Sequence, residues 1–385
     1  MFRSFSVTRM SGAGWHRAAF AVPLQRTSSS GGVFFFRKGV EKMVRVGILG
    51  GTGYTGLELL RILASHPKVE ISWVHSERFS GMSLEEYCPA WRKRVALMIS
   101  GQEVLDRARE VDVVFTALPH GVAMEYIPRL LEATRVVDLS ADFRFRCRET
   151  YEQWYGIPHK APHLLEEAVY GLPEVYRERI RTARLVANPG CYPTSVIIPL
   201  FPLLREGLVV PPVVVDSKSG VSGAGKKASE DLHFCEVDEN LRAYNIGTHR
   251  HGPEIAEQLS VLGGKGVEVH FVPHLLPVRR GILSTIYITL AREVSEEDLL
   301  TLWEQAFSGE PWVRVFPRGR FPELKWVVGS NFIDLGLRKV GARHVVIVSA
   351  IDNLTKGASG QAVQNLNIMF GIDERVGLPE GVLYP

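Results

Sequence analysis

The sequence predicts an α/β protein in which a parallel sheet, covered by helices on both faces, is followed by an α+β domain with a mixed sheet. Two observations support this expectation. Short apolar runs alternate with helical patterns in the first half, whereas beyond Cys191 such runs follow one another with fewer helices between them. A chain of 385 residues is also long enough for two domains with substantial cores.

The first domain is predicted to open on a strand at residues 44–49, VRVGIL, which ends in glycines. A helical pattern with leucines at helical spacing follows from about Tyr54. This alternation of strand and helix is expected to continue to about Ala187. Further strands of the same sheet are expected at residues 70–75, 111–116 and 135–139.

The second half is predicted to be richer in strands. The sequence S-E-E-D opens a helix at residues 295–307, and another helix is expected after Lys356. A mixed or antiparallel sheet of this kind suits substrate binding and subunit contact. Its strands are expected at residues 213–217, 267–272, 282–290, 332–338 and 344–351.

The charge of the chain is unevenly distributed along its length. Residues 1–42 carry a net charge of +6 and residues 43–385 a net charge of −3, so the main body offers no electrostatic footprint for nucleic acid. The first 42 residues are rich in Ser and Arg, which is typical of an organellar transit peptide. We favour the alternative that this extension is disordered or not native and that translation starts at Met43.

Hydropathy and cysteine usage exclude further classes of protein. The longest strongly apolar stretch, at residues 196–204, is short and broken by two prolines, so no membrane-spanning helix is predicted. The four cysteines, at positions 88, 147, 191 and 235, form no C-x-x-C pair. Neither a zinc ribbon nor a disulfide framework is therefore suggested, and a reducing compartment fits best.

The turn after the first strand, GGTGYTG, predicts a Rossmann-type dinucleotide-binding domain. Glycines let the backbone approach a pyrophosphate, and the following helix supplies unpaired N–H groups. A tight turn without a ligand would use the same glycines, but the position between strand and helix favours a cofactor. The expected cofactor-binding residues are Gly50, Gly51, Thr52, Gly53, Tyr54, Thr55 and Gly56.

The end of the second strand indicates which dinucleotide is bound. NAD sites tend to carry an acidic residue there, whereas this strand runs into Ser76, Glu77 and Arg78. A serine and an arginine suit a 2′-phosphate, because guanidinium pairs with phosphate in a bidentate way. Glu77 could instead serve NAD. We expect NADP(H).

The stretch NPGCYPT indicates a reactive cysteine. Asn-Pro-Gly ends a strand, and Pro193 is well placed in the first turn of a helix. Cys191 is then expected at the positive end of that helix, where the pKa of a thiol falls. The alternative is that Cys191 is a small buried hydrophobic residue, as free cysteines usually are.

A nucleophile needs a base, and the stretch THRHGPE offers two histidines. His249 and His251 flank Arg250 just before a helix start, a cluster suited to proton transfer and anion binding. The competing interpretation is a metal site, since H-x-H can chelate, but no third ligand is evident in the sequence.

Two more glycine-rich loops follow strands. The loop at residues 217–225 offers backbone N–H groups for an anion or the nicotinamide ring, although it could be a flexible turn. In it, Ser222 and Gly223 are expected to contact the cofactor and Ser219 the substrate. Asn353 and Gly357, in the strand-to-helix loop that begins at residue 352, are also expected to bind the cofactor.

Taken together, these motifs resemble the N-acetyl-γ-glutamyl-phosphate reductase family of arginine biosynthesis, which belongs with the semialdehyde dehydrogenases. The resemblance spans residues 43 to about 370. The matching motifs are GGTGYTG, LPHG at 118–121, DLSADFR at 138–144, YGLPE at 170–174, NPGCYPT, KSGVSGAG at 218–225, GTHRHGPE at 247–254, PHLLPVRRG at 273–281 and DNLTKGASGQAVQN at 352–365.

The resemblance implies a chemistry. Cys191 attacks an acyl phosphate, phosphate leaves, and hydride from NADPH reduces the thioester to a semialdehyde. A histidine of the HRH cluster acts as acid and base, and we favour His251 over His249. Arg250 and Arg144 are candidates for the carboxylate or phosphate of the substrate.

The resemblance also implies an organisation. Residues 43–189 form the NADP-binding domain, residues 190–350 the substrate and dimerisation domain, and residues 351–385 a C-terminal helix that returns to the first domain. A homodimer or homotetramer is expected, and a cytoplasmic location unless residues 1–42 are a transit peptide.

Three other functions stay open. The closest is the analogous aminoadipyl-phosphate reductase of lysine biosynthesis, because one methylene is worth only about 1–3 kcal/mol in a pocket. A catalytically dead NADP-binding sensor would not need the cysteine and histidines. A thiol hydrolase would leave the first glycine turn unexplained.

Overall fold

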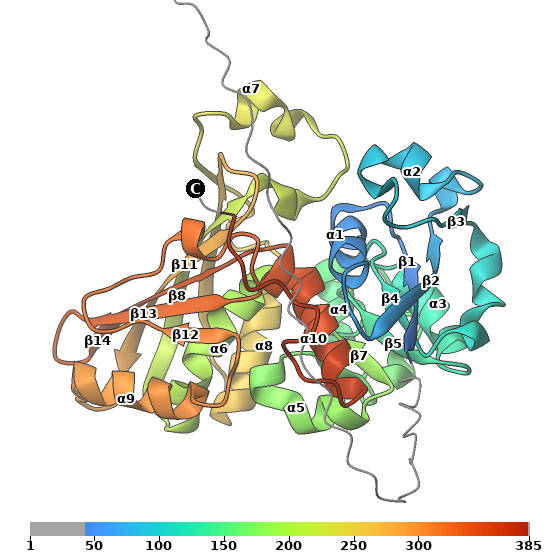
Figure 1. Cartoon of the computed structure of the whole chain (residues 1–385). Helices are drawn as coiled ribbons and strands as arrows, with labels where there is room; N and C mark the ends of the chain where they lie inside the picture. The colour runs from blue at the N-terminus through green and yellow to red at the C-terminus, as the bar shows by residue number, and fades with distance from the viewer. Residues whose placement is uncertain (1–42, 384–385) are drawn as a thin grey trace, which may run out of the picture. The chain divides into compact units, whose positions relative to one another are not determined.

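The computed structural model describes residues 43–383 of the chain (Figure 1). Its strands form two seven-stranded sheets. The expectations for residues 1–42, a transit peptide or a non-native extension, lie outside the described residues.

The first sheet is entirely parallel, with the strand order β3-β2-β1-β4-β5-β7-β6. The order reverses at β1, so the carboxyl ends of β1 and β4 flank the crevice where ligands bind in such sheets. This is the predicted Rossmann-type arrangement. The strands are β1 (Val44–Leu49), β2 (Val69–His75), β3 (Ile99–Ser100), β4 (Val113–Thr116), β5 (Arg135–Asp138), β6 (Val169–Tyr170) and β7 (Leu185–Ala187).

Helices cover both faces of this sheet. On one face, α1 (Tyr54–Leu63) and α10 (Gly360–Met369) share a core with β1 through residues such as Leu59 and Leu366. On the other face, α3 (Ala123–Leu130) and α4 (Arg148–Tyr155) pack against β4 and β5. The helices α2 (Leu84–Tyr87) and α5 (Pro173–Thr182) also follow strands of this sheet. In Figure 1, α10 lies beside α1 although some 300 residues separate them in the sequence.

The second sheet is mixed, as the sequence predicts, with the order β12-β13-β14-β11-β8-β10-β9. Only β12–β13 and β8–β10 pair in parallel. The strands are β8 (Val209–Gly220), β9 (Arg242–Ala243), β10 (Val269–Leu276), β11 (Ile282–Leu290), β12 (Val313–Val315), β13 (Ile333–Lys339) and β14 (His344–Ile351).

One face of the second sheet is covered by three helices, α6 (Cys191–Arg205), α8 (His251–Gly263) and α9 (Glu296–Phe307), and this forms the largest core of the described chain. On the opposite face Tyr287 is 45% exposed, and Val214 and Val346 are only partly buried. A short helix, α7 (Phe234–Val237), lies in the exposed segment between β8 and β9.

Some elements differ from the expectations. Strand β8 is longer than predicted, and β3, β6, β9 and β12 were not predicted, because two- or three-residue strands carry no period. The equally short β7 was expected, because the Asn-Pro-Gly turn marks its end. The apolar stretch at 196–204 lies within α6, which contains Pro199 and Pro202 and is buried in the second core. Among the described helices, none has the length and apolarity needed to cross a membrane.

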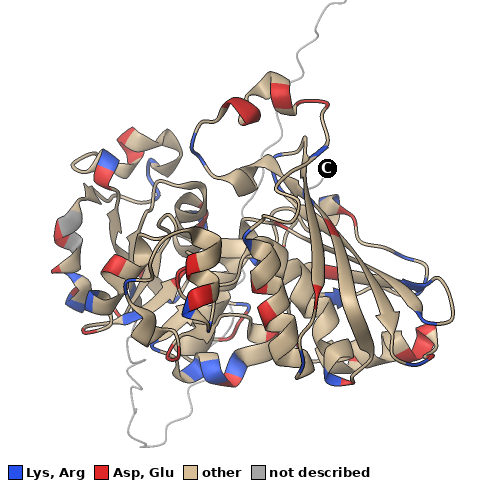
Figure 2. Ribbon diagram, turned by 180° about the vertical axis from the view of Figure 1, so that it is seen from behind, with Lys and Arg blue, Asp and Glu red and all other residues tan. Residues whose placement is uncertain are grey.

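Charged side chains of both signs are interspersed over the helices and loops of residues 43–383, whereas the strands of the second sheet are drawn almost entirely in the colour of uncharged residues (Figure 2).

Candidate active site

Cys191 lies at the start of a helix, as the sequence predicts. Strand β7 ends at Ala187, and the turn Asn188-Pro189-Gly190 leads directly into α6, with Gly190 as its N-cap residue. We call residues 188–191 the cysteine turn. A π-helical turn, Thr355–Ser359, approaches it closely: a Cβ atom on Gly357 would lie 2.8 Å from the Cβ of Cys191. Gly357 therefore permits this contact.

The helix start acts on the Cys191 thiol in the expected direction, but the expectation that the pKa falls is wrong. Burial raises the pKa of Cys191 to about 11. A hydrogen bond from the Tyr192 amide and the charge of Arg144 act in the opposite direction, and the charge of Glu254 raises the pKa further. Desolvation of the thiolate outweighs the favourable groups at the helix start.

Two cavities meet at Cys191. The first, of about 600 Å³, also includes the glycine turn at residues 50–55, and we call it the glycine-turn cavity. The second, of about 720 Å³, includes His249, and we call it the histidine cavity. Cys191 and His251 line both cavities. A cofactor in one cavity and a substrate in the other could therefore reach the same sulfur atom.

The glycine turn divides into residues that face the cavity and residues that pack beneath it. Gly51 and Gly56 lie beneath, since a Cβ on Gly56 would collide with the carbonyl oxygen of Gly50. By contrast, a Cβ on Gly53 would meet nothing nearer than 3.8 Å. The predicted cofactor residues that line the glycine-turn cavity are Gly50, Thr52, Gly53, Tyr54, Thr55, Ser222, Gly223, Asn353 and Gly357.

Of the residues predicted to select the dinucleotide, one lies next to the glycine-turn cavity and another lies outside both cavities. Ser76 is buried, and its Oγ lies 2.8 Å from Oγ1 of Thr52, next to the cavity. Arg78 is exposed, lies 5.2 Å from the centre of the Phe79 ring and lines neither cavity. Glu77 pairs with His75 at 3.4 Å.

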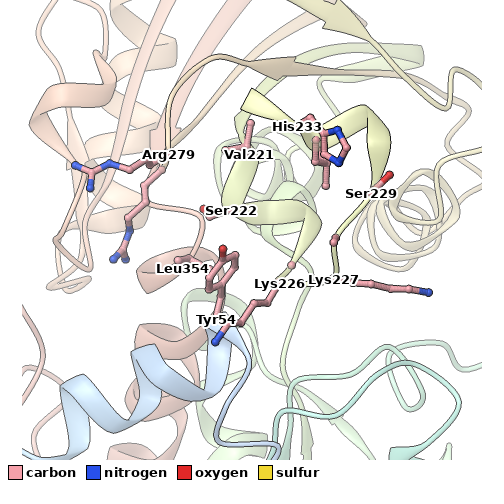
Figure 3. A pocket seen from close by; sticks show the side chains of 13 residues that line it. Tyr54, Val221, Ser222, Lys226, Lys227, Ser229, His233, Arg279 and Leu354 are labelled. Atoms are coloured by element: carbon pink, nitrogen blue, oxygen red, sulfur yellow. The ribbon is translucent and has the colours of Figure 1, made fainter. Parts of the chain in front are cut away.

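A neighbouring cavity of about 450 Å³ (Figure 3) is also lined by residues of the loop at 222–227, which lines the glycine-turn cavity too. Tyr54 and Lys226 line both of them. Lys226 also hydrogen-bonds the hydroxyl of Tyr87, which in turn donates to the carbonyl oxygen of Thr52 at 2.8 Å. The loop thus links the second sheet to the glycine turn.

His251 is the histidine nearest to the cysteine turn. It is the first residue of α8, and its ring lies over Gly190, where an added Cβ would be 2.5 Å from Nε2. Its Nδ1 is buried and has no hydrogen-bond partner within residues 43–383. His249 is one step further away: its Nδ1 accepts a hydrogen bond from the His251 amide at 3.1 Å, and it lines only the histidine cavity of the two.

Both histidines are held neutral. Burial, followed by the charge of Arg250, lowers the pKa of His249 to about 4. Burial, followed by the neighbouring His249 and Arg144, holds the pKa of His251 well below its usual range. A neutral imidazole beside a thiol can accept its proton. In the part of the chain that the structure describes, no group of three or more His, Cys, Asp or Glu side chains could hold a metal ion.

The three predicted substrate residues have different surroundings. Arg250 is exposed, lines the histidine cavity and lies 5.0 Å from the centre of the Tyr155 ring. Ser219 lines the same cavity. Arg144 lines the glycine-turn cavity but is buried, and each of its three guanidinium nitrogens already has a protein partner.

Several residues that line the cavities were not predicted from the sequence. His120, in the LPHG motif that follows β4, lines both cavities, and its Nδ1 accepts a hydrogen bond from Ala141 at 3.0 Å. Its position after a predicted strand is a signal that could have found it. Tyr155 and Tyr244 also line the histidine cavity, but neither lies in a glycine-rich loop or near a strand end that had been predicted.

The chain joins a parallel sheet, with a glycine turn at its carboxyl edge, to a mixed-sheet domain that carries a cysteine and a histidine. This combination defines a dehydrogenase of the semialdehyde dehydrogenase class. Comparison with known families agrees. Residues 45–183 match the family described as "Semialdehyde dehydrogenase, NAD binding domain", and residues 191–353 match "Semialdehyde dehydrogenase, dimerisation domain".

Curated relatives narrow this class. Proteins named N-acetyl-gamma-glutamyl-phosphate reductase from Symbiobacterium thermophilum and Geotalea daltonii are 52% and 51% identical. The matches cover 89% of this chain in both cases, and 99% and 100% of the two relatives. The chain therefore belongs to the N-acetyl-gamma-glutamyl-phosphate reductase family and is an oxidoreductase, which confirms the resemblance found in the sequence.

Solved structures agree on the fold. An aspartate semialdehyde dehydrogenase II from Vibrio cholerae superimposes with a TM-score of 0.68 at 17% identity, over 86% of this chain and 99% of that one. A probable aspartate-semialdehyde dehydrogenase from Pseudomonas aeruginosa gives a TM-score of 0.64 at 18% identity, with the same coverage. At such identities the likeness concerns the fold alone.

Proposed function

We propose that this chain reduces N-acetyl-γ-glutamyl phosphate to N-acetylglutamate semialdehyde with NADPH, releasing inorganic phosphate, as a step of arginine biosynthesis. The observation that best supports this function is the position of Cys191 and neutral His251 on the wall shared by two cavities. The names of the relatives supply the substrate class.

The glycine-turn cavity fits a dinucleotide. Gly53 lines it with open space in front of its Cα atom, so that a side chain there would occupy volume that a pyrophosphate needs. Thr52 in the turn after β1 and Ser76 after β2 contribute neighbouring hydroxyls, and Ser222, Gly223, Asn353 and Gly357 line the cavity as well. When bound, NADPH supplies the hydride.

The reaction divides among the residues of this chain. His251 takes the thiol proton at a ring nitrogen, and the Sγ atom of Cys191 forms a bond to the acyl carbon while the carbon–oxygen bond to phosphate breaks. The proton held by His251 passes to the leaving phosphate. His251 then takes a second proton from solvent. After the thioester has been reduced, the carbon–sulfur bond breaks, the aldehyde departs and the Cys191 thiolate recovers that proton from His251. His249 is the alternative acid and base.

The substrate is proposed to lie in the histidine cavity. Arg250 is exposed there and would pair with a carboxylate or phosphate, and Ser219 would donate a hydrogen bond. Arg144 is less suited to this role, because its guanidinium nitrogens are bound to Asn188, Leu139 and Glu254.

The preference for NADPH over NADH is the finer part of the cofactor proposal. Ser76 and Thr52 place hydroxyls, not a carboxylate, beside the cavity, which suits a 2′-phosphate. Two cations lie nearby: Lys226, which lines the cavity and contacts the Tyr87 ring, and Arg78, which contacts the adjoining Phe79 ring. The nucleotide-binding domain would comprise residues 43–189 and the substrate domain residues 190–350. Residues 351–385 would form the C-terminal segment that returns to the first domain.

We also propose a homodimer or homotetramer in the cytoplasm. The second sheet has one face covered by α6, α8 and α9, and an opposite face on which Tyr287 is 45% exposed beside partly buried valines. A second copy packed on this face would bury that apolar surface.

The deciding experiment is an assay of NADP⁺ reduction with N-acetylglutamate semialdehyde and inorganic phosphate. We expect phosphate-dependent turnover, at least tenfold lower kcat/KM with NAD⁺, and weaker turnover with the aminoadipate analogue that is one methylene longer. Higher turnover with the longer analogue would assign the lysine-pathway reaction, and no turnover with intact NADPH binding would indicate a sensor.

A further inference from the structure

A buried ion pair lies directly behind the cysteine turn. Arg144 follows β5 in the sequence and Glu254 lies on the first turn of α8, and Nη1 of the arginine is 3.2 Å from Oε2 of the glutamate. Their side chains are 5% and 0% exposed. A buried pair of this kind costs desolvation energy and seldom stabilises a fold beyond what apolar residues would achieve, so its presence here needs another reason.

Both members of the pair hold the backbone of the cysteine turn. Nε of Arg144 donates to the carbonyl oxygen of Asn188 at 2.8 Å. Oε1 of Glu254 accepts the amide hydrogen of Gly190 at 2.9 Å, and the hydroxyl of Tyr170 donates to the same oxygen at 2.8 Å. The residues on both sides of Pro189 are thus fixed, and Cys191 follows immediately.

The same pair fixes the position of the histidine. Glu254 comes three residues after His251 on α8, so both side chains lie on one face of that helix. The carboxylate binds Gly190, and the His251 ring lies over Gly190. One carboxylate therefore ties the helix that carries the base to the residue that precedes the nucleophile.

Other charged and titratable groups line the two cavities that meet at the thiol. They comprise His120 after β4, Tyr155 on α4, Tyr192 on α6, Lys226, Lys227 and Asp231 in the segment after β8, Arg242 on β9, Tyr244 after β9, and His249, Arg250 and His251 at the start of α8. Besides burial, which raises the pKa of Cys191 most, the charge of Arg144 lowers this pKa and the charge of Glu254 raises it.

We propose that Arg144 and Glu254 are positioning residues which hold the cysteine turn against His251 and, through their opposite charges, set the reactivity of the Cys191 thiol. The proposal rests on the proposed function in taking Cys191 as the nucleophile. It replaces the substrate-binding role expected for Arg144 and gives a role to Glu254, for which none was predicted from the sequence.

The test compares two variants that break the same ion pair. Alkylation of Cys191 by iodoacetamide is followed by peptide mass spectrometry across pH, without substrate or cofactor. Glu254→Gln keeps an acceptor for Gly190 but removes the negative charge, so the midpoint of the profile should fall by about one pH unit, with about tenfold faster alkylation below it. Arg144→Gln should raise the midpoint by a similar amount.

A merely structural role cannot shift the midpoints of the two alkylation profiles in opposite directions, since loss of the same contact would move both midpoints the same way. Equal shifts of one sign, or no shift in either variant, would overturn the proposal. Cys235 is exposed in the same chain, so its alkylation serves as an internal reference and should not change.

Two milder variants cover the case in which the glutamine variants do not fold. Arg144→Lys keeps the charge but cannot bind Asn188, Leu139 and Glu254 together, so we expect an unchanged midpoint with about tenfold lower kcat. Tyr170→Phe frees one oxygen of Glu254 and should raise the midpoint by a few tenths of a unit. Unchanged kcat in the first together with an unchanged midpoint in the second would refute the proposal.

The failure of the proposed function would look different. If Cys191→Ser retained turnover, Cys191 would not be the nucleophile, whereas the alkylation profiles of the Arg144 and Glu254 variants would still report on the thiol itself.

Discussion

Two of the turns that follow strands and line the glycine-turn cavity present different chemistry. The glycine turn after β1 offers backbone N–H groups, and its shape depends on residues without side chains, such as Gly56 beneath Gly50. The cysteine turn after β7 offers a thiol, and its backbone is held by the charged side chains of Arg144 and Glu254.

The difference concerns what each turn has to hold in place. A phosphate-binding turn needs only space and aligned amides, which glycines supply from local sequence alone. A nucleophile needs a defined position relative to a base, and that requires contacts from segments distant in the sequence. The first turn should therefore be disrupted by added volume, and the second by changes in charge or in reacting groups.

The largest effect is expected from removing the reacting atom of the cysteine turn. Cys191→Ser should lower kcat by at least about 10⁴-fold, because a serine hydroxyl is a far weaker nucleophile at neutral pH. Binding of NADPH, measured by fluorescence titration, should persist. Cys147→Ser is the matched control, since Cys147 is exposed and lies in neither cavity, and it should retain full turnover.

The next effect separates the two histidines. His251→Asn should lower kcat by about 10²–10⁴-fold, as expected for loss of the acid and base, and should flatten the acidic limb of the pH–rate profile. His249→Asn should cost less, because His249 contacts the backbone of His251 and does not lie over Gly190. The reverse order of the two losses would assign the proton transfer to His249.

Two glycines within the glycine turn, Gly56 and Gly53, can be compared with each other. Gly56→Ala places a methyl group against the carbonyl oxygen of Gly50 and should lower the free energy of unfolding by about 1–3 kcal/mol, measured without nucleotide. Gly53→Ala has room for the methyl group, so it should leave thermal stability unchanged and weaken only the affinity for NADPH. Equal loss of stability in both variants would contradict the division of this turn into packing and binding residues.

The smallest effect is expected in the pH dependence of thermal stability. The pKa of His249 is about 4 when the protein is folded, below the ordinary value of 6.5, so the unfolded chain binds more protons between these two pH values. Stability should therefore fall as the pH drops from about 6.5 to 4. His249→Asn should show a smaller loss of thermal stability between pH 7 and pH 5, whereas His270→Asn, on an exposed strand position, should behave like the wild type.

The same contrast explains what the sequence could predict. Local patterns of glycine, proline and alternating apolar residues predict the glycine turn, the helix that begins at Cys191 and the strands β1, β11 and β14. The two histidines that flank Arg250 just before a helix start were located from their local sequence as well. In each case the signal lies within about ten consecutive residues.

What the sequence could not predict depends on contacts between distant segments. The pKa of Cys191 is raised because α6 is buried between other elements, and no pattern around NPGCYPT reports that burial. Arg78 follows the second strand as expected but lies over Phe79, outside both cavities. Glu254 was overlooked because its partners, Arg144 and Gly190, are 110 and 64 residues away.

The position of α10 has a consequence for biosynthesis on the ribosome. Val363 and Leu366 complete a core whose other residues, such as Val46 and Leu59, are synthesised some 300 residues earlier. The nascent first sheet therefore emerges with an apolar face that α1 covers only in part. Until the residues of α10 arrive, the rest of this face is open to chaperones, and a ribosome that stalled within the second sheet would release a chain with it unprotected.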